Sequence, residues 1–298
     1  MSAPGRPRGE YRSAQHEATS MSVGVRLQGA ALLLGIAAAL AGCIAAGPGP
    51  GGPRSAATPA NETKDRITAS DEPDAQKRAR ARMELASAYF GQNQMTTALD
   101  QVKLAIVADP NYGEAFNLRG LIYANLGDTV LAEESFKRAL QLNPRDADAM
   151  HNYGYYLCQQ KRYAESNVLF GQALAVPQYP GIARTLLTQG VCLAYAGQLA
   201  ESEAALARAY ELDPSSPFTA TNLAEVLYRR GDFERARFYI RRVNALPGVS
   251  NAQTLWLAVR IEHKLGNWPG TSEFGQQLRN RFPESREAAS FSRGAFDE

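Results

Sequence analysis

Histidine and cysteine are the residue types here whose chemistry depends most on spacing. The three histidines, His16, His151 and His263, lie far apart, and none pairs with a neighbour at the spacing of metal ligands. The sequence also has no phosphate-binding glycine loop and no nucleophile elbow. These absences predict a chain that is not an enzyme and carries no metal or organic cofactor. The three cysteines, Cys43, Cys158 and Cys192, remain as candidates for covalent chemistry.

Cys43 ends an apolar stretch that begins at Leu27, follows Arg26 and has no charge between residues 30 and 41. A basic residue, an apolar run and small residues in this order are typical of a secretory signal peptide. Leu40-Ala41-Gly42-Cys43 resembles the bacterial lipobox, which implies cleavage before Cys43 and acylation of that residue. A transmembrane anchor is the alternative, and it is disfavoured because a spanning helix needs about 20 apolar residues.

The segments around Cys43 define the first domain boundaries. Residues 1–42 are assigned to the signal region, which a translation start at Met21 would shorten. Residues 43–76 are rich in Gly, Pro, Ala, Ser and Thr, so we expect a lipidated, flexible and disordered linker. Ile44 stands where aspartate would retain an enterobacterial lipoprotein at the inner membrane, which implies sorting to the outer membrane. The basic run over 77–82 is interpreted as a solvated helix face, with contact to lipid head groups as the alternative.

Beyond the linker, small residues recur at intervals of 34, 34, 36 and 34 residues: Ala86, Gly120, Gly154, Gly190 and Ala224. Each is followed seven residues later by a predicted turn residue: Asn93, Gly127, Lys161, Gly197 and Gly231. Three units end in Asp109-Pro110, Asn143-Pro144 and Asp213-Pro214, where proline disfavours a helical residue before it. A period of 34 residues is typical of the tetratricopeptide repeat (TPR), a helix-turn-helix unit that stacks into an array.

The predicted fold is therefore all-α, a TPR superhelix of about six helix-turn-helix repeats over residues 77–291, with 292–298 as a C-terminal tail. The repeats are placed at 79–112, 113–146, 147–182, 183–216, 217–251 and 252–285. The third has two extra residues around Pro177-Gln178-Tyr179-Pro180, and the sixth has Val259 and Gly275 where a small and a large residue are expected. An irregular helical domain is the alternative, and five units with coincident landmarks disfavour it.

The charge balance excludes one class of partner. The chain has 32 Lys and Arg against 30 Asp and Glu, and removal of residues 1–42 would leave 28 of each. Binding of nucleic acid needs a basic surface, so no nucleic-acid partner is expected. A small-molecule substrate is not expected either. TPR arrays bind partners along an extended concave surface, which predicts a protein-binding chain.

The two remaining cysteines lie on the first helices of adjacent predicted repeats. Cys158 is position 12 of repeat three, and Cys192 is position 10 of repeat four. Since such helices lie side by side, a disulfide across this junction is predicted in an oxidising compartment. Two buried, reduced cysteines that only pack against each other are the alternative.

The inner faces of the first helices are the predicted partner groove. Positions 2, 5, 9, 12 and 13 typically line such a groove in the repeat family, and the surface here combines aromatic, aliphatic and amide side chains suited to an extended or helical peptide. Each residue could instead be a packing position. The candidates are Asn117, Leu121, Asn125, His151, Tyr155, Gln159, Leu187, Val191, Tyr195, Tyr228 and Arg229, with Glu225 beside them.

The third repeat and the C-terminus resemble one family in particular. The segments Asn152–Cys158, Lys161–Tyr163 and Pro177–Pro180 look like the third repeat of the PilF/PilW lipoproteins, and Leu278–Pro283 with Ser285 and Phe291 is similar to their C-terminus. These are the pilotins of the type IV pilus secretin. The resemblance covers about residues 79–291, whereas the long Gly- and Pro-rich linker departs from the family.

This resemblance implies a lipid-anchored protein on the periplasmic side of the outer membrane of a Gram-negative bacterium. Its partners would be the secretin subunits, held in the groove, and the outer membrane, held through the acyl chains on Cys43. The protein would promote secretin localisation and multimerisation, and hence pilus assembly and twitching motility. Two alternatives stay open: a TPR lipoprotein scaffold that helps to assemble outer-membrane proteins, and a regulator of cell-wall synthesis.

Overall fold

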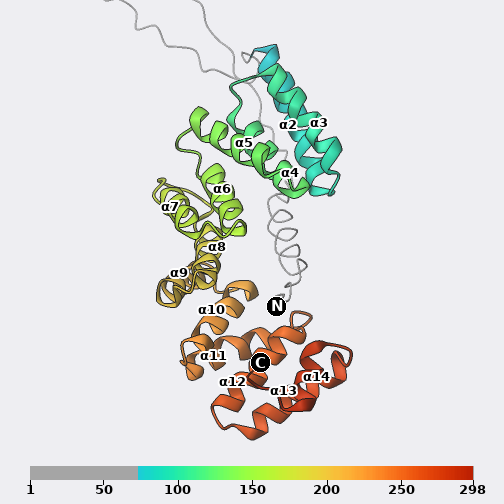
Figure 1. Ribbon diagram of the computed structural model, residues 1–298, viewed down its shortest axis with the longest axis vertical. Helices are drawn as coiled ribbons and strands as arrows, with labels where there is room; N and C mark the ends of the chain where they lie inside the picture. The colour runs from blue at the N-terminus through green and yellow to red at the C-terminus, as the bar shows by residue number, and fades with distance from the viewer. Residues whose placement is uncertain (1–72, 298) are drawn as a thin grey trace, which may run out of the picture. The chain divides into compact units, whose positions relative to one another are not determined.

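Residues 73–297 are described by the structure, a computed structural model, and they contain helices and connecting turns without a strand. The signal region, Cys43 and most of the predicted linker lie outside this range. Residues 78–298 group into one unit. Its helices follow one another as antiparallel pairs along the chain (Figure 1). They are α2 (Asp74–Gly91), α3 (Met95–Ala108), α4 (Gly113–Leu126), α5 (Thr129–Leu142), α6 (Ala147–Gln159), α7 (Tyr163–Leu174), α8 (Ile182–Tyr195), α9 (Leu199–Leu212), α10 (Pro217–Arg229), α11 (Phe233–Asn244), α12 (Ala252–Lys264), α13 (Trp268–Arg281) and α14 (Arg286–Arg293).

The six predicted repeats correspond to the six pairs from α2/α3 to α12/α13, so the all-α TPR fold is confirmed. All five predicted turn residues adopt positive φ; the two that are not glycine are Asn93 at 60° and Lys161 at 63°. The left-handed conformation lets the chain reverse direction between two helices. At the repeat ends, Asp109, Asn143 and Asp213 leave the helical conformation immediately before a proline, as the sequence predicts.

In the second and fourth hairpins, a glycine on the first helix faces a large residue on the second. A Cβ atom added to Gly120 would lie 2.8 Å from the Phe136 ring, and one added to Gly190 would lie 2.6 Å from Cγ of Leu206. Phe136 and Leu206 are themselves fully buried. The absent side chain therefore sets how closely the two helices approach.

The sixth hairpin reverses these sizes. Val259 stands at the small position and Gly275 at the large one, and both are buried. The ring of Phe291 occupies the space beside Gly275, because a Cβ there would lie 1.9 Å from its Cζ. Phe291 belongs to α14, a helix that the sequence analysis does not predict. Gly275, which departs from the repeat pattern, thus provides the space in which the terminal helix α14 docks and covers the end of the array.

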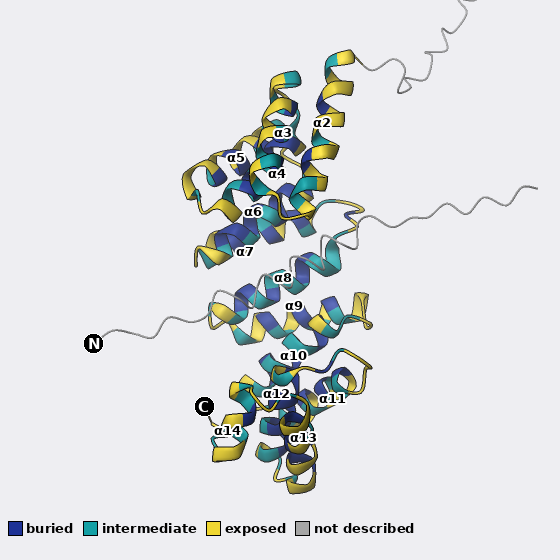
Figure 2. Ribbon diagram, turned by 90° about the vertical axis from the view of Figure 1, so that its right-hand side faces the viewer, coloured by how far each residue is buried: buried dark blue, intermediate teal, exposed yellow. Residues whose placement is uncertain are grey.

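Both ends of the repeat region differ in detail from the predicted boundaries. Helix α2 begins at Asp74, inside the segment assigned to the linker. At the other end, α14 continues to Arg293, and Gly294 reverses the chain with φ of 70°. Residues 294–297 then return to α12, so the predicted tail packs on the last repeat. Figure 2 shows the buried residues gathered between the helices and the exposed ones on their outer sides.

Candidate partner-binding groove

The first helices of successive repeats form one layer, since α4 contacts α6, α6 contacts α8, α8 contacts α10, and α10 contacts α12. All eleven predicted groove residues lie on four of these helices: three each on α4, α6 and α8, and two on α10. The predicted groove residues therefore all lie on one layer of helices. A concave layer of parallel helices presents their exposed side chains to one extended partner.

The predicted groove residues differ in depth. Four have exposed side chains: Asn125, Gln159, Tyr195 and Arg229. Six are half-buried: Asn117, Leu121, Tyr155, Leu187, Val191 and Tyr228. Asn125 donates to the backbone oxygen of Leu121 one turn earlier, whereas Tyr195 leaves 53% of its surface exposed. Exposed and half-buried residues together supply polar groups and apolar area for a partner.

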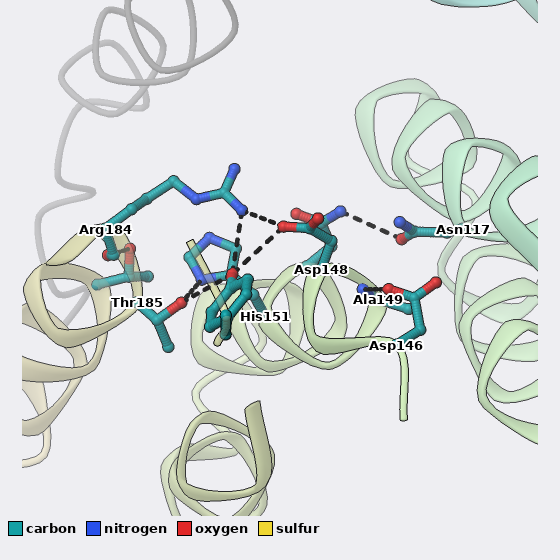
Figure 3. Close-up of polar contacts among 10 residues, drawn as sticks. Asn117, Asp146, Asp148, Ala149, His151, Arg184 and Thr185 are labelled. Carbon is teal, nitrogen blue, oxygen red and sulfur yellow. Dashed lines mark hydrogen bonds and ion pairs between the residues drawn. The ribbon is translucent and has the colours of Figure 1, made fainter. Parts of the chain in front are cut away.

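His151 is the exception, because only 6% of it is exposed. Its Nδ1 lies 2.9 Å from Oγ1 of Thr185 on α8 (Figure 3). Its ring packs against Phe170. Burial, together with the smaller effect of the charge on Arg184, lowers the pKa of His151 to about 3. The imidazole is therefore neutral and connects α6 to α8 beneath the surface, so the expected direct contact with a partner does not fit its position.

A polar network extends from His151 across the junction of repeats three and four. Arg184 donates to Oδ1 of Asp148 at 2.5 Å and to the hydroxyl of Tyr179 at 3.2 Å (Figure 3). The same hydroxyl lies 3.1 Å from Oγ1 of Thr185. Tyr179 comes from the two-residue insertion and is buried, so the insertion supplies a side chain that joins α6 and α8.

The two cysteines lie on the same pair of helices. The sulfur atoms of Cys158 and Cys192 are 2.26 Å apart, and the Cα atoms are 5.9 Å apart. A Cα separation of this size is typical of disulfides. The cysteines lie near the carboxyl ends of α6 and α8, whereas the Arg184 network lies near their amino ends. The cysteine pair and the Arg184 network therefore lie at opposite ends of this junction.

A cleft of about 470 Å³ lies on the layer between α2, α4 and the start of α6. Two predicted groove residues, Asn117 and Leu121, line it. Asn117 also accepts a hydrogen bond from Asn152 on α6. The other lining residues are Met83, Glu114, Leu118, Asn143, Arg145, Asp146, Ala147 and Asp148. The cleft thus combines apolar side chains with three carboxylates and one guanidinium, a composition that favours a partner segment with apolar and basic side chains.

The carboxyl-terminal half of the layer has a different character. The guanidinium of Arg260 lies 4.8 Å from the ring centre of Tyr228 and also pairs with Glu225 at 3.3 Å. Arg229 donates to the backbone oxygen of Ala194. Aromatic rings and guanidinium groups therefore dominate here, and carboxylates dominate at the other end.

Asp148, Arg184 and Tyr179 are not among the predicted site residues. A signal was present, because Asp148 and Arg184 both occupy position 2, which typically lines a TPR groove. Residues 73–297 contain no cluster of histidine, cysteine and carboxylate side chains that could hold a metal ion. Within the same range, no helix is both long and apolar enough to cross a membrane.

Comparisons with known proteins agree with this architecture. Tetratricopeptide repeat models match residues 113–146, 135–166 and 187–248. The type IV pilus assembly protein PilF of Pseudomonas aeruginosa is 25% identical over 262 residues, which cover 88% of this chain and 97% of that protein.

Two solved structures extend the comparison. The crystal structure of PilW, described as a widely conserved type IV pilus biogenesis factor, is 32% identical and superposes with a TM-score of 0.66. That match covers 71% of this chain and 97% of PilW. The structure of Pseudomonas aeruginosa PilF has a TM-score of 0.68 at 24% identity, covers 74% of this chain and all of that one, and supports the fold.

Proposed function

The chain belongs to the PilF/PilW family of TPR proteins of type IV pilus biogenesis, and from that premise we propose that it is an adaptor for pilus assembly. The observation that carries the proposal is the match to PilW, which spans nearly the whole of that protein at 32% identity. The groove on α4 to α12 supports a protein partner. Its side chains supply apolar area and hydrogen-bonding groups to a bound protein. The adaptor would act by binding alone, without a chemical step.

The partner that we propose is the subunit of the outer-membrane secretin. A segment of that subunit would lie along the groove, with apolar and basic side chains in the cleft beside Leu121 and Asn117. An adaptor that holds several subunits near one membrane raises their local concentration, which favours assembly of a multimer. Pilus assembly and twitching motility would then depend on this chain.

The place of action that we propose is the periplasmic face of the outer membrane. Cys43 would carry the acyl chains, because the segment Leu40–Cys43 that closes the apolar stretch resembles a lipobox. Two or more acyl chains hold a protein stably on a membrane. The linker after Cys43 would give the repeat region reach from the lipid to its partner. In this oxidising compartment Cys158 and Cys192 would form a disulfide.

The test is a deletion strain assayed for heat- and detergent-resistant secretin multimers and for twitching motility. We expect both to be lost on deletion and restored by the wild-type gene. Cys43→Ala should restore them poorly because the protein is no longer held at the membrane. Normal multimers and normal twitching in the deletion strain would contradict the proposal.

A matched pair of variants tests the groove itself. Tyr195 on α8 and Leu212 at the end of α9 are almost equally exposed, at 53% and 52%. We expect Tyr195→Ala to reduce multimer formation and Leu212→Ala to leave it unchanged. Porin levels and muropeptide profiles in the deletion strain address the two alternatives, since outer-membrane protein assembly or cell-wall synthesis would be disturbed in those cases.

A further inference from the structure

In the last repeat, the C-terminal segment of the chain itself contacts the positions that would line a groove. In the register of the other repeats, Trp256, Arg260, His263 and Lys264 of α12 are positions 5, 9, 12 and 13 of repeat six. These are positions that typically line the groove of a TPR. Three of the four contact the chain's own C-terminal segment.

Phe296 and Asp297 make these contacts. The ring of Phe296 stacks on His263 with centres 4.1 Å apart and on Trp256 with centres 6.0 Å apart, and both pairs lie within 25° of parallel. Lys264 donates to Oδ1 of Asp297, and this hydrogen bond raises the pKa of the ammonium group. An aromatic side chain and the carboxylate that follows it therefore occupy positions 5, 12 and 13.

The path of this segment is fixed by a defined turn. Gly294 ends α14 in the left-handed conformation, its N–H donates to the oxygen of Phe291, and Ala295 N–H donates to the oxygen of Ser290. This pair of bonds is the Schellman motif, in which glycine reverses the chain after a helix. Phe291 is itself anchored in the space beside Gly275. The segment after Gly294 is thus directed to α12 by two successive anchors.

The surface around Phe296 continues past the segment. Trp268 lies edge-on to His263 at 5.2 Å between ring centres and leaves 63% of its surface exposed. On the other side, Arg260 covers Tyr228 of repeat five. An aromatic and cationic strip therefore joins repeat six to repeat five, and Phe296 with Asp297 covers one part of it.

We propose that the inner face of repeat six is a subsite for a peptide segment with an aromatic residue followed by a carboxylate, and that Phe296 and Asp297 occupy it in cis. The ring of the segment stacks between Trp256 and His263, and its carboxylate pairs with Lys264. A segment on the same chain has an effective concentration on the order of millimolar, so a partner in trans must displace it. The assignment of this subsite to the pilus partner rests on the proposed function. The preference for an aromatic residue followed by a carboxylate rests on the contacts of Phe296 and Asp297 alone.

The test uses the purified full-length protein and a labelled peptide of residues 293–298, Arg-Gly-Ala-Phe-Asp-Glu, in a fluorescence anisotropy titration. The variant Phe296→Ala/Asp297→Lys vacates the subsite without touching α12. We expect this variant to bind the peptide at least about tenfold more tightly than the wild type, in which the segment competes in cis. Adding Lys264→Ala to the vacated variant should weaken binding severalfold, because the ammonium partner of the peptide's carboxylate is removed. A peptide with alanine in place of phenylalanine should not bind.

Equal, or equally absent, binding by the wild type and the vacated variant would overturn the proposal. So would an affinity for the peptide that Lys264→Ala leaves unchanged. Circular dichroism and the thermal midpoint establish that each variant is folded before it is titrated. Because no secretin is present, this titration tests the subsite alone, and the multimer assay in the deletion strain tests the proposed function separately.

Discussion

At the scale of single residues, the burial of His151 changes its acid–base chemistry. Its pKa falls from 6.5 to about 3 because the ring is buried and Arg184 is near. As the pH falls below 6.5, the imidazole of His151 becomes protonated in the unfolded chain but stays neutral in the native protein. The free energy of unfolding therefore decreases. The loss is about 1.4 kcal/mol per pH unit and ends near the native pKa.

His151→Gln should remove this contribution, because an amide can bond to Thr185 and does not titrate. We expect the variant to lose less stability than the wild type between pH 6.5 and 3, as measured by urea unfolding at a series of pH values. Carboxylates titrate in both proteins, so the difference between the two curves isolates the histidine. Parallel curves would show that His151 becomes protonated in the native state.

The backbone conformation of Lys161 leads to a second prediction at this scale. It has φ of 63° at the turn of the third hairpin, a region that costs a residue with a Cβ about 1–2 kcal/mol relative to glycine. Lys161→Gly should therefore stabilise the protein. Its neighbour Gln160, with φ of −79°, gains nothing from glycine, so Gln160→Gly should be neutral or destabilising. Thermal unfolding of the two variants decides the matter, and equal shifts would contradict this reading.

At the scale of helices, the close approach within each hairpin depends on missing side chains. A Cβ on Gly190 would lie 2.6 Å from Leu206, whereas Gly171, on the exposed side of α7, has no atom within 4 Å of such a Cβ. Gly190→Ala should therefore destabilise the protein by about 1–3 kcal/mol through overpacking. Gly171→Ala should stabilise it by up to about 1 kcal/mol, because alanine is the better helix former.

The opposite signs are the critical result of that pair, measured by chemical denaturation. Stabilisation by both substitutions would show that the hairpin of α8 and α9 can widen without cost. Loss of stability in both would show that Gly171 has a packing role that its open surroundings do not reveal.

The helices and their turns could be predicted from the sequence because each repeat carries its own local signals. Asn93 and Lys161 were found as turn residues from spacing alone, although neither is glycine. Helix α14 could not be predicted in the same way, since Pro283 reads as the end of the last repeat and the segment after it is short and polar. Its anchor, Phe291 beside Gly275, depends on a contact between residues that no period relates.

The site was predictable to the level of the helix layer and no further. The register placed His151 on the inner layer, but its depth depends on Thr185 and Phe170 of neighbouring helices, which the register does not describe. Tyr179 was noted only as part of an insertion, and its hydroxyl reaches Arg184 and Thr185 through a loop path that has no repeat. Side-chain depth is a property of the packed array, whereas the period is a property of the chain.

For the molecule as a whole, we expect the junction of repeats three and four to couple the unfolding of the two halves of residues 78–297. In a repeat array, stability is approximately a sum over repeats and nearest-neighbour interfaces. The Arg184 network lies at one end of the α6/α8 contact, and Cys158 lies beside Cys192 at the other. A weakened junction would let repeats on either side unfold separately.

The predicted disulfide makes this consequence measurable. It would close a loop between residues 34 apart, which in the chain-entropy model contributes about 3–4 kcal/mol. We expect reductant to lower the thermal midpoint of the wild type and to broaden or split its transition, because the two halves lose coupling. The Cys158→Ala/Cys192→Ala variant should melt at the lower temperature with or without reductant.

Arg184→Gln in the oxidised protein should lower the midpoint without splitting the transition, since the cross-link still couples the halves. A wild-type protein insensitive to reductant, with a free-thiol titre of two at these positions, would rule out the bond and leave the Arg184 network to hold the junction.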